Sequence, residues 1–149
     1  MSGPTIEFKG NLGGTPDLRI TPNGKTVCTV SVASTPSRKV AEGQYEDLET
    51  IWFKVTCWDS LAENVAHSLQ KGDRVVVHGY LEQETWQRED GTSSVKLRVR
   101  ATALGADLGR APVLVKRPVR EVVPPSPWAD EAATGGEPQA DAVTEEQAA

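Results

Sequence analysis

Hydrophobic and polar residues alternate with a period of two over several short segments of the chain. Residues 5–14 begin in this way and then run into glycines, which favours a strand that curves. Residues 17–21 and 25–34 flank Asn23-Gly24, a pair that predicts an antiparallel hairpin with a positive φ at both central positions. Residues 73–86 and 94–104 alternate around Asp90-Gly91, which predicts a second hairpin.

The segment between these hairpins changes to the helical period. Three apolar residues lie four positions apart, namely Leu61, Val65 and Leu69. Ser60 stands three residues before Glu63, as in a capping box, and Gly72 supplies a stop signal. The pattern predicts one short amphipathic helix. The polar segment 35–47 predicts a long loop before the next strand.

The order over residues 1–110 is therefore three strands, one helix and two strands. This is the layout of an all-β OB-fold, a five-stranded Greek-key barrel, here with one short helix between strands 3 and 4. A β-sandwich is the alternative, but five strands are few for a sandwich, and a small sheet gains from closing its edges. Residues 111–120 are expected to hold one extra strand around 113–115, and the Pro-, Ala-, Gly- and Glu-rich residues 121–149 a disordered acidic tail.

The strand at residues 50–58 carries two tryptophans on its polar side. Four residues of the other parity predict the core face, and they are Ile51, Phe53, Val55 and Cys57. Trp52 and Trp58 share the opposite face with Lys54, and Trp86 stands among polar residues near the end of the fourth strand. An exposed indole stacks on a nucleobase with about 1–3 kcal/mol per base and tolerates any sequence. The three rings are therefore candidate binding platforms.

Charge is distributed unevenly along the chain. The formal net charge is −5, but residues 1–110 carry 13 Lys+Arg against 14 Asp+Glu, and residues 111–149 carry 3 against 7. A nearly neutral body has no global basic field, so contacts to phosphate must be local. The candidate cations are Arg38, Lys39, Lys54, Lys96, Arg98 and Arg100. The last three alternate along one strand, which is also the pattern of an ordinary solvated sheet face.

The remaining reactive residue types do not form a recognisable catalytic or metal-binding motif. Cys28 and Cys57 lack zinc-site spacing and share the apolar parity of their strands, so we expect buried thiols, with a disulfide between neighbouring strands as the alternative. His67 and His78 have no acidic neighbour in a motif that would make either a catalytic base. We therefore expect no enzyme activity, no metal and no cofactor.

Targeting signals are equally scarce. The first residues contain no basic segment followed by an apolar run, and the chain has no stretch of about 18 consecutive apolar residues. These features predict a cytoplasmic protein that does not contact a membrane.

Taken together in their order, several stretches resemble bacterial single-stranded DNA-binding proteins of the homotetrameric type. The stretches are GNLGGTPDLRITPNGKTV, VSVAS, ETIWFKVTCWDSLAENVAHSLQKGDRVVVHGYLEQETW and the Asp-Gly turn with its following strand, within residues 4–108. AENVAHSL and the expected strand near Val113 resemble the high-GC Gram-positive branch, in which an extra strand clasps subunits together.

The resemblance implies a homotetramer that binds and protects single-stranded DNA in replication, recombination and repair. Trp52, Trp58 and Trp86 match the family's stacking positions, and Arg38 stands where a further family aromatic is found. The sequence ends in VTEEQAA, without the family's acidic Pro-Phe tip. On this pattern we expect a paralogue that recruits repair proteins weakly or not at all.

Two other functions fit the same residues. In the first, the protein is an OB-fold assembly subunit whose exposed rings bury against a protein partner. In the second, the barrel binds RNA or an oligosaccharide. Salt separates the first from DNA binding, because phosphate contacts weaken steeply with salt and apolar contacts weaken little.

Overall fold

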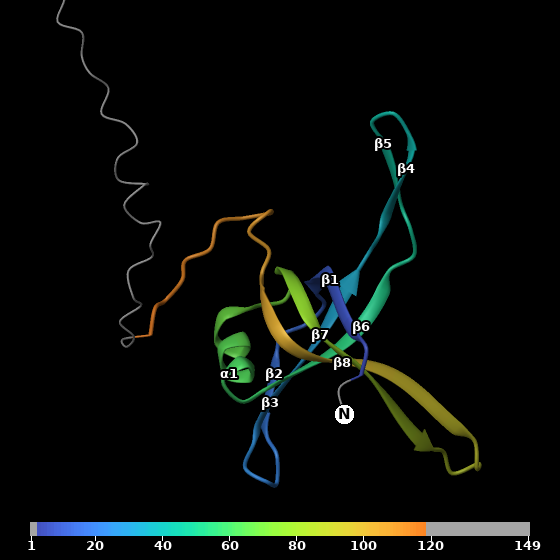
Figure 1. The fold of residues 1–149 in the computed structure, drawn as a ribbon, viewed down its shortest axis with the longest axis vertical. Helices are drawn as coiled ribbons and strands as arrows, with labels where there is room; N and C mark the ends of the chain where they lie inside the picture. Colours follow the sequence, from blue (N-terminus) through green and yellow to red (C-terminus); the bar gives the residue numbers. More distant parts are fainter. Residues whose placement is uncertain (1–2, 119–149) are drawn as a thin grey trace, which may run out of the picture. The chain divides into compact units, whose positions relative to one another are not determined.

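The computed structural model describes residues 3–118, and the described residues up to Val113 form one compact unit. This unit is mainly β structure with one helix (Figure 1). Its principal strands are β1 (Thr5–Leu12), β3 (Thr26–Ser34), β6 (Ile51–Trp58), β7 (Arg74–Gln87) and β8 (Ser93–Ala106). The helix, α1 (Asp59–Ser68), lies between β6 and β7 in the chain. The predicted all-β OB-fold is confirmed.

The five principal strands pair in a closed ring. β1 pairs with β7, β7 with β8, β6 with β3 and β3 with β1, all antiparallel, and the parallel pair of β6 and β8 completes the ring. A closed sheet leaves no long free edge among these strands. The short strand β2 (Asp17–Ile20) pairs antiparallel with β3, as the predicted hairpin requires.

Closure brings backbones close together at Gly10. A Cβ on this residue would lie 2.6 Å from Val32 Cγ1 and even closer to the carbonyl oxygen of Ala33. β1 crosses β3 at this point, since Asn11 is already in register with Ala33. A residue without a side chain is therefore required where the barrel closes.

The barrel interior is filled mainly by valines. Val30, Val32, Val55, Val77 and Val99 are essentially inaccessible to solvent. The helix α1 covers one end of this core, and it contributes the buried residues Ala62 and Val65 (Figure 1). The hydrophobic period predicted for this segment is therefore confirmed at its centre.

The predicted faces of β6 are correct only in part. Val55 and Cys57 are buried, but Ile51 is exposed because the strand begins next to Ser34, at the far end of the pairing with β3. Thr56 has the same strand parity as Trp52 and Trp58, which predicts the polar side, but it is buried. Its hydroxyl donates a hydrogen bond to the carbonyl oxygen of Val99 (3.4 Å), on the neighbouring strand β8.

The predicted capping box is wrong. The helix begins at Asp59 and has Trp58 as its extended N-cap, without a side-chain hydrogen bond to the first turn. β6 runs directly into α1, so Ser60 already lies within the helix and is not available as a cap. The helix also ends earlier than predicted, at Ser68 instead of near Gly72.

Both predicted turns occur, but the Asn23-Gly24 turn does not have the predicted positive φ at both central positions. A positive φ is found at Gly24 (78°) and Gly91 (81°), but not at the residue before either glycine. The Gly24 N–H donates to the Thr21 carbonyl oxygen (2.8 Å), and the Gly91 N–H donates to that of Arg88 (3.0 Å). Each loop is therefore a type I turn followed by a left-handed glycine.

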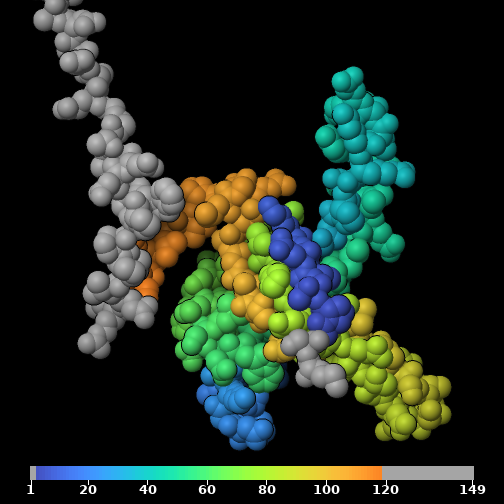
Figure 2. Space-filling model, in the orientation of Figure 1, coloured from blue at the N-terminus to red at the C-terminus, as the bar shows by residue number. Residues whose placement is uncertain are grey.

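The predicted loop 35–47 is largely a hairpin. It consists of β4 (Ser37–Ala41) and β5 (Gln44–Asp47). Figure 2 shows this hairpin, in cyan, projecting away from the barrel. The outer part of the β7–β8 pair, in olive, also projects from the barrel, in a different direction. The polar composition of the segment hid its strands, because neither face is buried.

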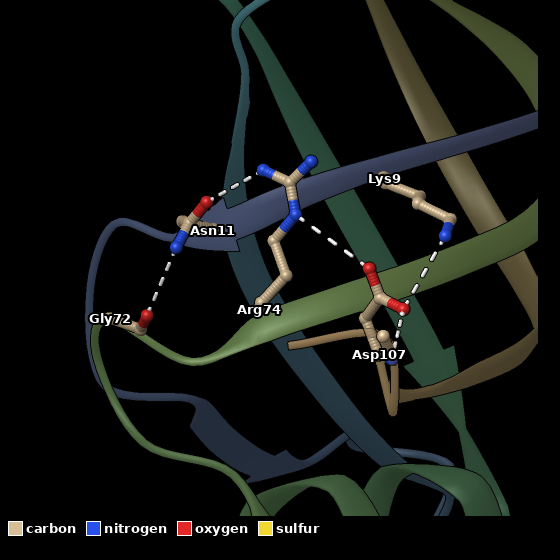
Figure 3. A network of polar contacts seen from close by, with 6 residues as sticks. Lys9, Asn11, Gly72, Arg74 and Asp107 are labelled. Atoms are coloured by element: carbon tan, nitrogen blue, oxygen red, sulfur yellow. Dashed lines mark hydrogen bonds and ion pairs between the residues drawn. The ribbon is translucent and has the colours of Figure 1, made fainter. Parts of the chain in front are cut away.

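A polar network ties the ends of β1, β7 and β8 together (Figure 3). The carboxylate of Asp107 contacts Lys9 Nζ (3.4 Å), Arg74 Nε (3.9 Å) and the Gly109 N–H (3.1 Å). The Arg74 guanidinium also donates to Asn11 Oδ1 (2.9 Å). The pKa of Asp107 is lowered, chiefly by the hydrogen bond from the Gly109 backbone and then by Lys9.

We expect Asp107→Asn to lower the thermal midpoint at neutral pH. A carboxyl group whose pKa is lower in the folded state adds stability above its unfolded pKa and loses it as pH falls through the folded pKa. The difference in midpoint between the wild type and Asp107→Asn should therefore narrow on acidification, measured by circular dichroism. A difference that stays constant with pH would show that the ionised carboxylate does not stabilise the fold.

Three predictions concern the region after the barrel. Residues 113–115 form no strand within the part of the single chain that the structure describes, and a clasp with another subunit stays a prediction. The predicted tail, residues 121–149, and the weak recruitment of repair proteins expected from it lie outside the described residues.

No helix between residues 3 and 118 is long and apolar enough to cross a membrane.

Candidate nucleic-acid interface

Most predicted binding residues lie on one face of the neighbouring strands β6, β8 and β7. Lys54 is in register with Arg98, which is in turn in register with Glu82. Residues in register on adjacent strands point to the same side of a sheet. We call this surface the outer sheet face, and it comprises Trp52, Lys54, Trp58, Lys96, Arg98, Arg100, Tyr80, Glu82, Glu84 and Trp86.

Trp52 is an open platform with a fixed support. Its side chain is 62% exposed, and its indole lies against Gly13, where an added Cβ would be 2.8 Å from Cη2. The Gly13 N–H is anchored to the carbonyl oxygen of Ser31 on β3 (2.9 Å). The indole is thus supported from below while most of its surface remains in water.

Trp58 forms the wall of a shallow hollow. The hollow has a volume of about 450 Å³, and its lining consists of Lys25, Trp58, Asp59, Leu61, Arg100, Ala101 and Thr102. Trp58 itself is 36% exposed. The hollow therefore offers an aromatic surface beside two cations, Lys25 and Arg100. Sequence reasoning missed Lys25, because only the fold brings the β2–β3 turn next to β8.

The third tryptophan is partly covered. Trp86 is half-buried, and Lys96 Nζ lies 4.8 Å from the centre of its ring, a cation–π contact. The guanidinium carbon of Arg100 lies 5.2 Å from the centre of the Tyr80 ring in the same way. Trp86 therefore lies beside the basic residues of β8, and Lys96 already covers one face of its ring.

The predicted basic stripe on β8 is largely paired with acids. Arg98 and Arg100 both contact Glu82, at 3.2 Å and 2.7 Å, and Arg98 also contacts Glu84 at 3.5 Å. The hydrogen bond from Arg100 is the main cause of the lowered pKa of Glu82. Lys54 has no carboxylate within ion-pair distance among residues 3–118. Sequence reasoning missed the acids, because they lie on β7 and become neighbours only through the strand register.

The two cations predicted in the loop lie on opposite sides of the β4–β5 hairpin. Arg38 is in register with Glu46 and forms an ion pair with it (3.1 Å). Lys39 is in register with Tyr45, whose side chain is 68% exposed. Lys39 and Tyr45 therefore share one face of the hairpin, which carries a cation beside an exposed aromatic ring. Sequence reasoning passed over Tyr45, because the segment was predicted as a loop.

The two thiols lie in the core, and the two imidazoles form local hydrogen bonds. Cys28 and Cys57 are free, buried and directly opposite each other on β3 and β6, and burial raises the pKa of Cys57 to about 12. His67 is exposed on α1, and His78 Nδ1 forms a hydrogen bond with Thr102 Oγ1 (2.9 Å). Within residues 3–118, no three His, Cys, Asp or Glu side chains are grouped as metal ligands would be.

Comparison with known proteins gives matches over most of the chain. Residues 5–106 match the Single-strand binding protein family. The single-stranded DNA-binding protein of Mycobacterium tuberculosis is 36% identical over 122 residues, which cover 80% of this chain and 74% of the relative. That of Corynebacterium glutamicum is 39% identical over 116 residues, which cover 77% and 52%.

One solved structure matches the fold of the chain. The small single-stranded DNA-binding protein from Streptomyces coelicolor has a TM-score of 0.66 and 33% identity, covering 74% of this chain and 100% of that chain. These organisms confirm the predicted resemblance to the high-GC Gram-positive branch.

Proposed function

Since this chain belongs to the single-strand binding protein family, we propose that it binds and protects single-stranded DNA in replication, recombination and repair. The observation that carries this proposal is Trp52, an indole that is 62% exposed and supported on Gly13. Every base has a π-face, so stacking on such a ring does not depend on sequence.

The proposed mechanism combines stacking with local phosphate contacts. Bases stack on Trp52, Trp58 and Trp86, while the cations of the outer sheet face and the hairpin residues Arg38 and Lys39 follow the backbone. The body of the chain is nearly neutral, so stacking supplies a large share of the affinity. The binding function requires no metal, cofactor or catalytic step, and we propose that the protein is not an enzyme.

The assembly state and location form part of the same proposal. Residues 1–110 form the binding domain, and residues 111–120 supply a strand that clasps another subunit in a homotetramer. The exposure of Val113 and Leu114 in the single chain supports a role for this segment between subunits. The protein works in the bacterial cytoplasm, where chromosomal single strands are formed.

Affinity for oligo-dT at several salt concentrations tests this function. The logarithm of the association constant should fall linearly with the logarithm of salt, because binding to phosphates releases counterions. Light scattering on the same samples gives the mass of the assembly. A complex that does not respond to salt, or no complex with DNA, would favour a protein partner on the exposed rings.

We expect Tyr45→Ala to weaken the binding of long oligo-dT by about 1 kcal/mol, the lower end for loss of a stacked base. The ring is 68% exposed, and Lys39 on the same face of the hairpin can reach the adjacent phosphate. Tyr45→Phe keeps the ring and should keep the affinity, as measured by fluorescence anisotropy. Equal affinity of the wild type and Tyr45→Ala would exclude Tyr45 from the site.

A further inference from the structure

Aromatic, acidic and basic side chains form a regular ladder on the β7–β8 part of the outer sheet face. Four cross-strand pairs follow one another, namely Tyr80 with Arg100, Glu82 with Arg98, Glu84 with Lys96, and Trp86 with Ser94. The acids occupy the middle of the ladder and the rings its two ends. A surface that binds a polyanion through stacking and cations has no evident need for carboxylates at its centre.

Glu82 is the central member of this ladder. One of its oxygens lies 3.2 Å from Arg98 Nε, and the other lies 2.7 Å from Arg100 Nε. The Glu82 side chain is only 28% exposed. A single carboxylate therefore occupies a donor on each of two guanidinium groups, and a phosphate that approaches either group must compete with it.

We propose that Glu82 is an internal counterion of the DNA-binding surface, which holds Arg98 and Arg100 in place in the free protein and yields them to phosphates of the bound strand. This inference rests on the proposed function. Glu82 is a residue that limits affinity rather than one that contributes to it. Glu84, which contacts Arg98 at 3.5 Å, acts in the same direction with a smaller effect.

The proposal has a consequence for the response to salt. Salt weakens binding because cations of the protein displace counterions from DNA. For a single strand, each neutralised phosphate adds about 0.7 to the slope of the logarithm of the association constant against the logarithm of salt. When a phosphate displaces Glu82, the protein loses one ion pair as it gains another. Arg98 and Arg100 therefore contribute less to affinity than their charges suggest.

A purely structural role of Glu82 leads to the opposite result. If the carboxylate were needed only to orient the two arginines, its removal would leave them disordered and binding would weaken. The sign of the change in affinity separates the two roles, and the salt slope reports on the arginines that contact phosphate.

The test compares full-length wild type with Glu82→Gln, using labelled oligo-dT over a range of salt concentrations. We expect binding about 2- to 10-fold tighter at low salt, because the competing ion pairs are removed. The slope of the logarithm of the association constant against the logarithm of the salt concentration should become steeper by about 0.7 for each chain that contacts the strand. Glu63→Gln is the matched control, since it removes the same charge from the exposed surface of α1 and should leave affinity and slope nearly unchanged.

Unchanged or weaker binding by Glu82→Gln would overturn the proposal, and so would equal tightening by the Glu63→Gln control. If Glu82→Gln does not fold, as judged by circular dichroism, the sign of the effect is taken from Glu84→Gln, which should tighten binding more modestly. Failure of the wild type to bind oligo-dT would instead overturn the proposed function.

Discussion

Replacement of Trp52 by alanine lowers the affinity for oligo-dT by about 1–3 kcal/mol without unfolding the protein. The ring is 62% exposed and belongs to no buried cluster, so its removal leaves the valine core intact. Trp58→Ala should have a similar effect on binding. Circular dichroism checks the fold, and fluorescence anisotropy of a labelled strand gives the affinity.

Trp52→Phe is the matched control for this experiment. A phenyl ring keeps a smaller π-face above Gly13, so we expect it to retain an intermediate affinity. If Trp52→Ala binds oligo-dT as tightly as the wild type, the strand does not stack on Trp52 and the proposed site is wrong.

Replacement of Gly79 by alanine destabilises the barrel by about 1–3 kcal/mol, the usual cost of forcing an extra carbon into a packed site. The added Cβ would lie 2.8 Å from Ala101 Cα and even closer to the carbonyl oxygen of Arg100. Backbone cannot move aside as a flexible side chain can. The register of β7 and β8 also shifts between His78 and Gly79, so the strands are bent at this point.

Gly105 offers a matched control on the partner strand. A Cβ there meets no atom within 4 Å, so Gly105→Ala should change the free energy of unfolding by less than about 0.5 kcal/mol. Urea denaturation measures both variants. Equal stability of Gly79→Ala and Gly105→Ala would mean that the β7–β8 bend tolerates a side chain.

The barrel and its order were predictable because its strands each bury one face, which leaves a period of two in the sequence. The β4–β5 hairpin was missed because both of its faces are exposed and carry no such period. The predicted start of α1 was wrong because β6 continues into the helix without a connecting loop. A capping motif in the sequence does not reveal such a direct connection.

The indoles were predictable for a related reason. Trp52 and Trp58 occupy positions of their strand at which the alternation predicts polar residues. The pairing of Arg98 and Arg100 with Glu82 was not predictable, because it depends on the register between two strands. Periodicity identifies the face of a residue but not the neighbour across the strand. The electrostatic character of the surface therefore follows only from the fold.

Intrinsic fluorescence during titration with oligo-dT tests most directly whether bases lie against the indoles. A Trp128→Phe background limits the emission to Trp52, Trp58 and Trp86. Stacked bases should quench this emission in a saturable way, and Trp52→Ala should remove part of the quenching. Emission that does not change while anisotropy reports a bound strand would contradict stacking on the outer sheet face.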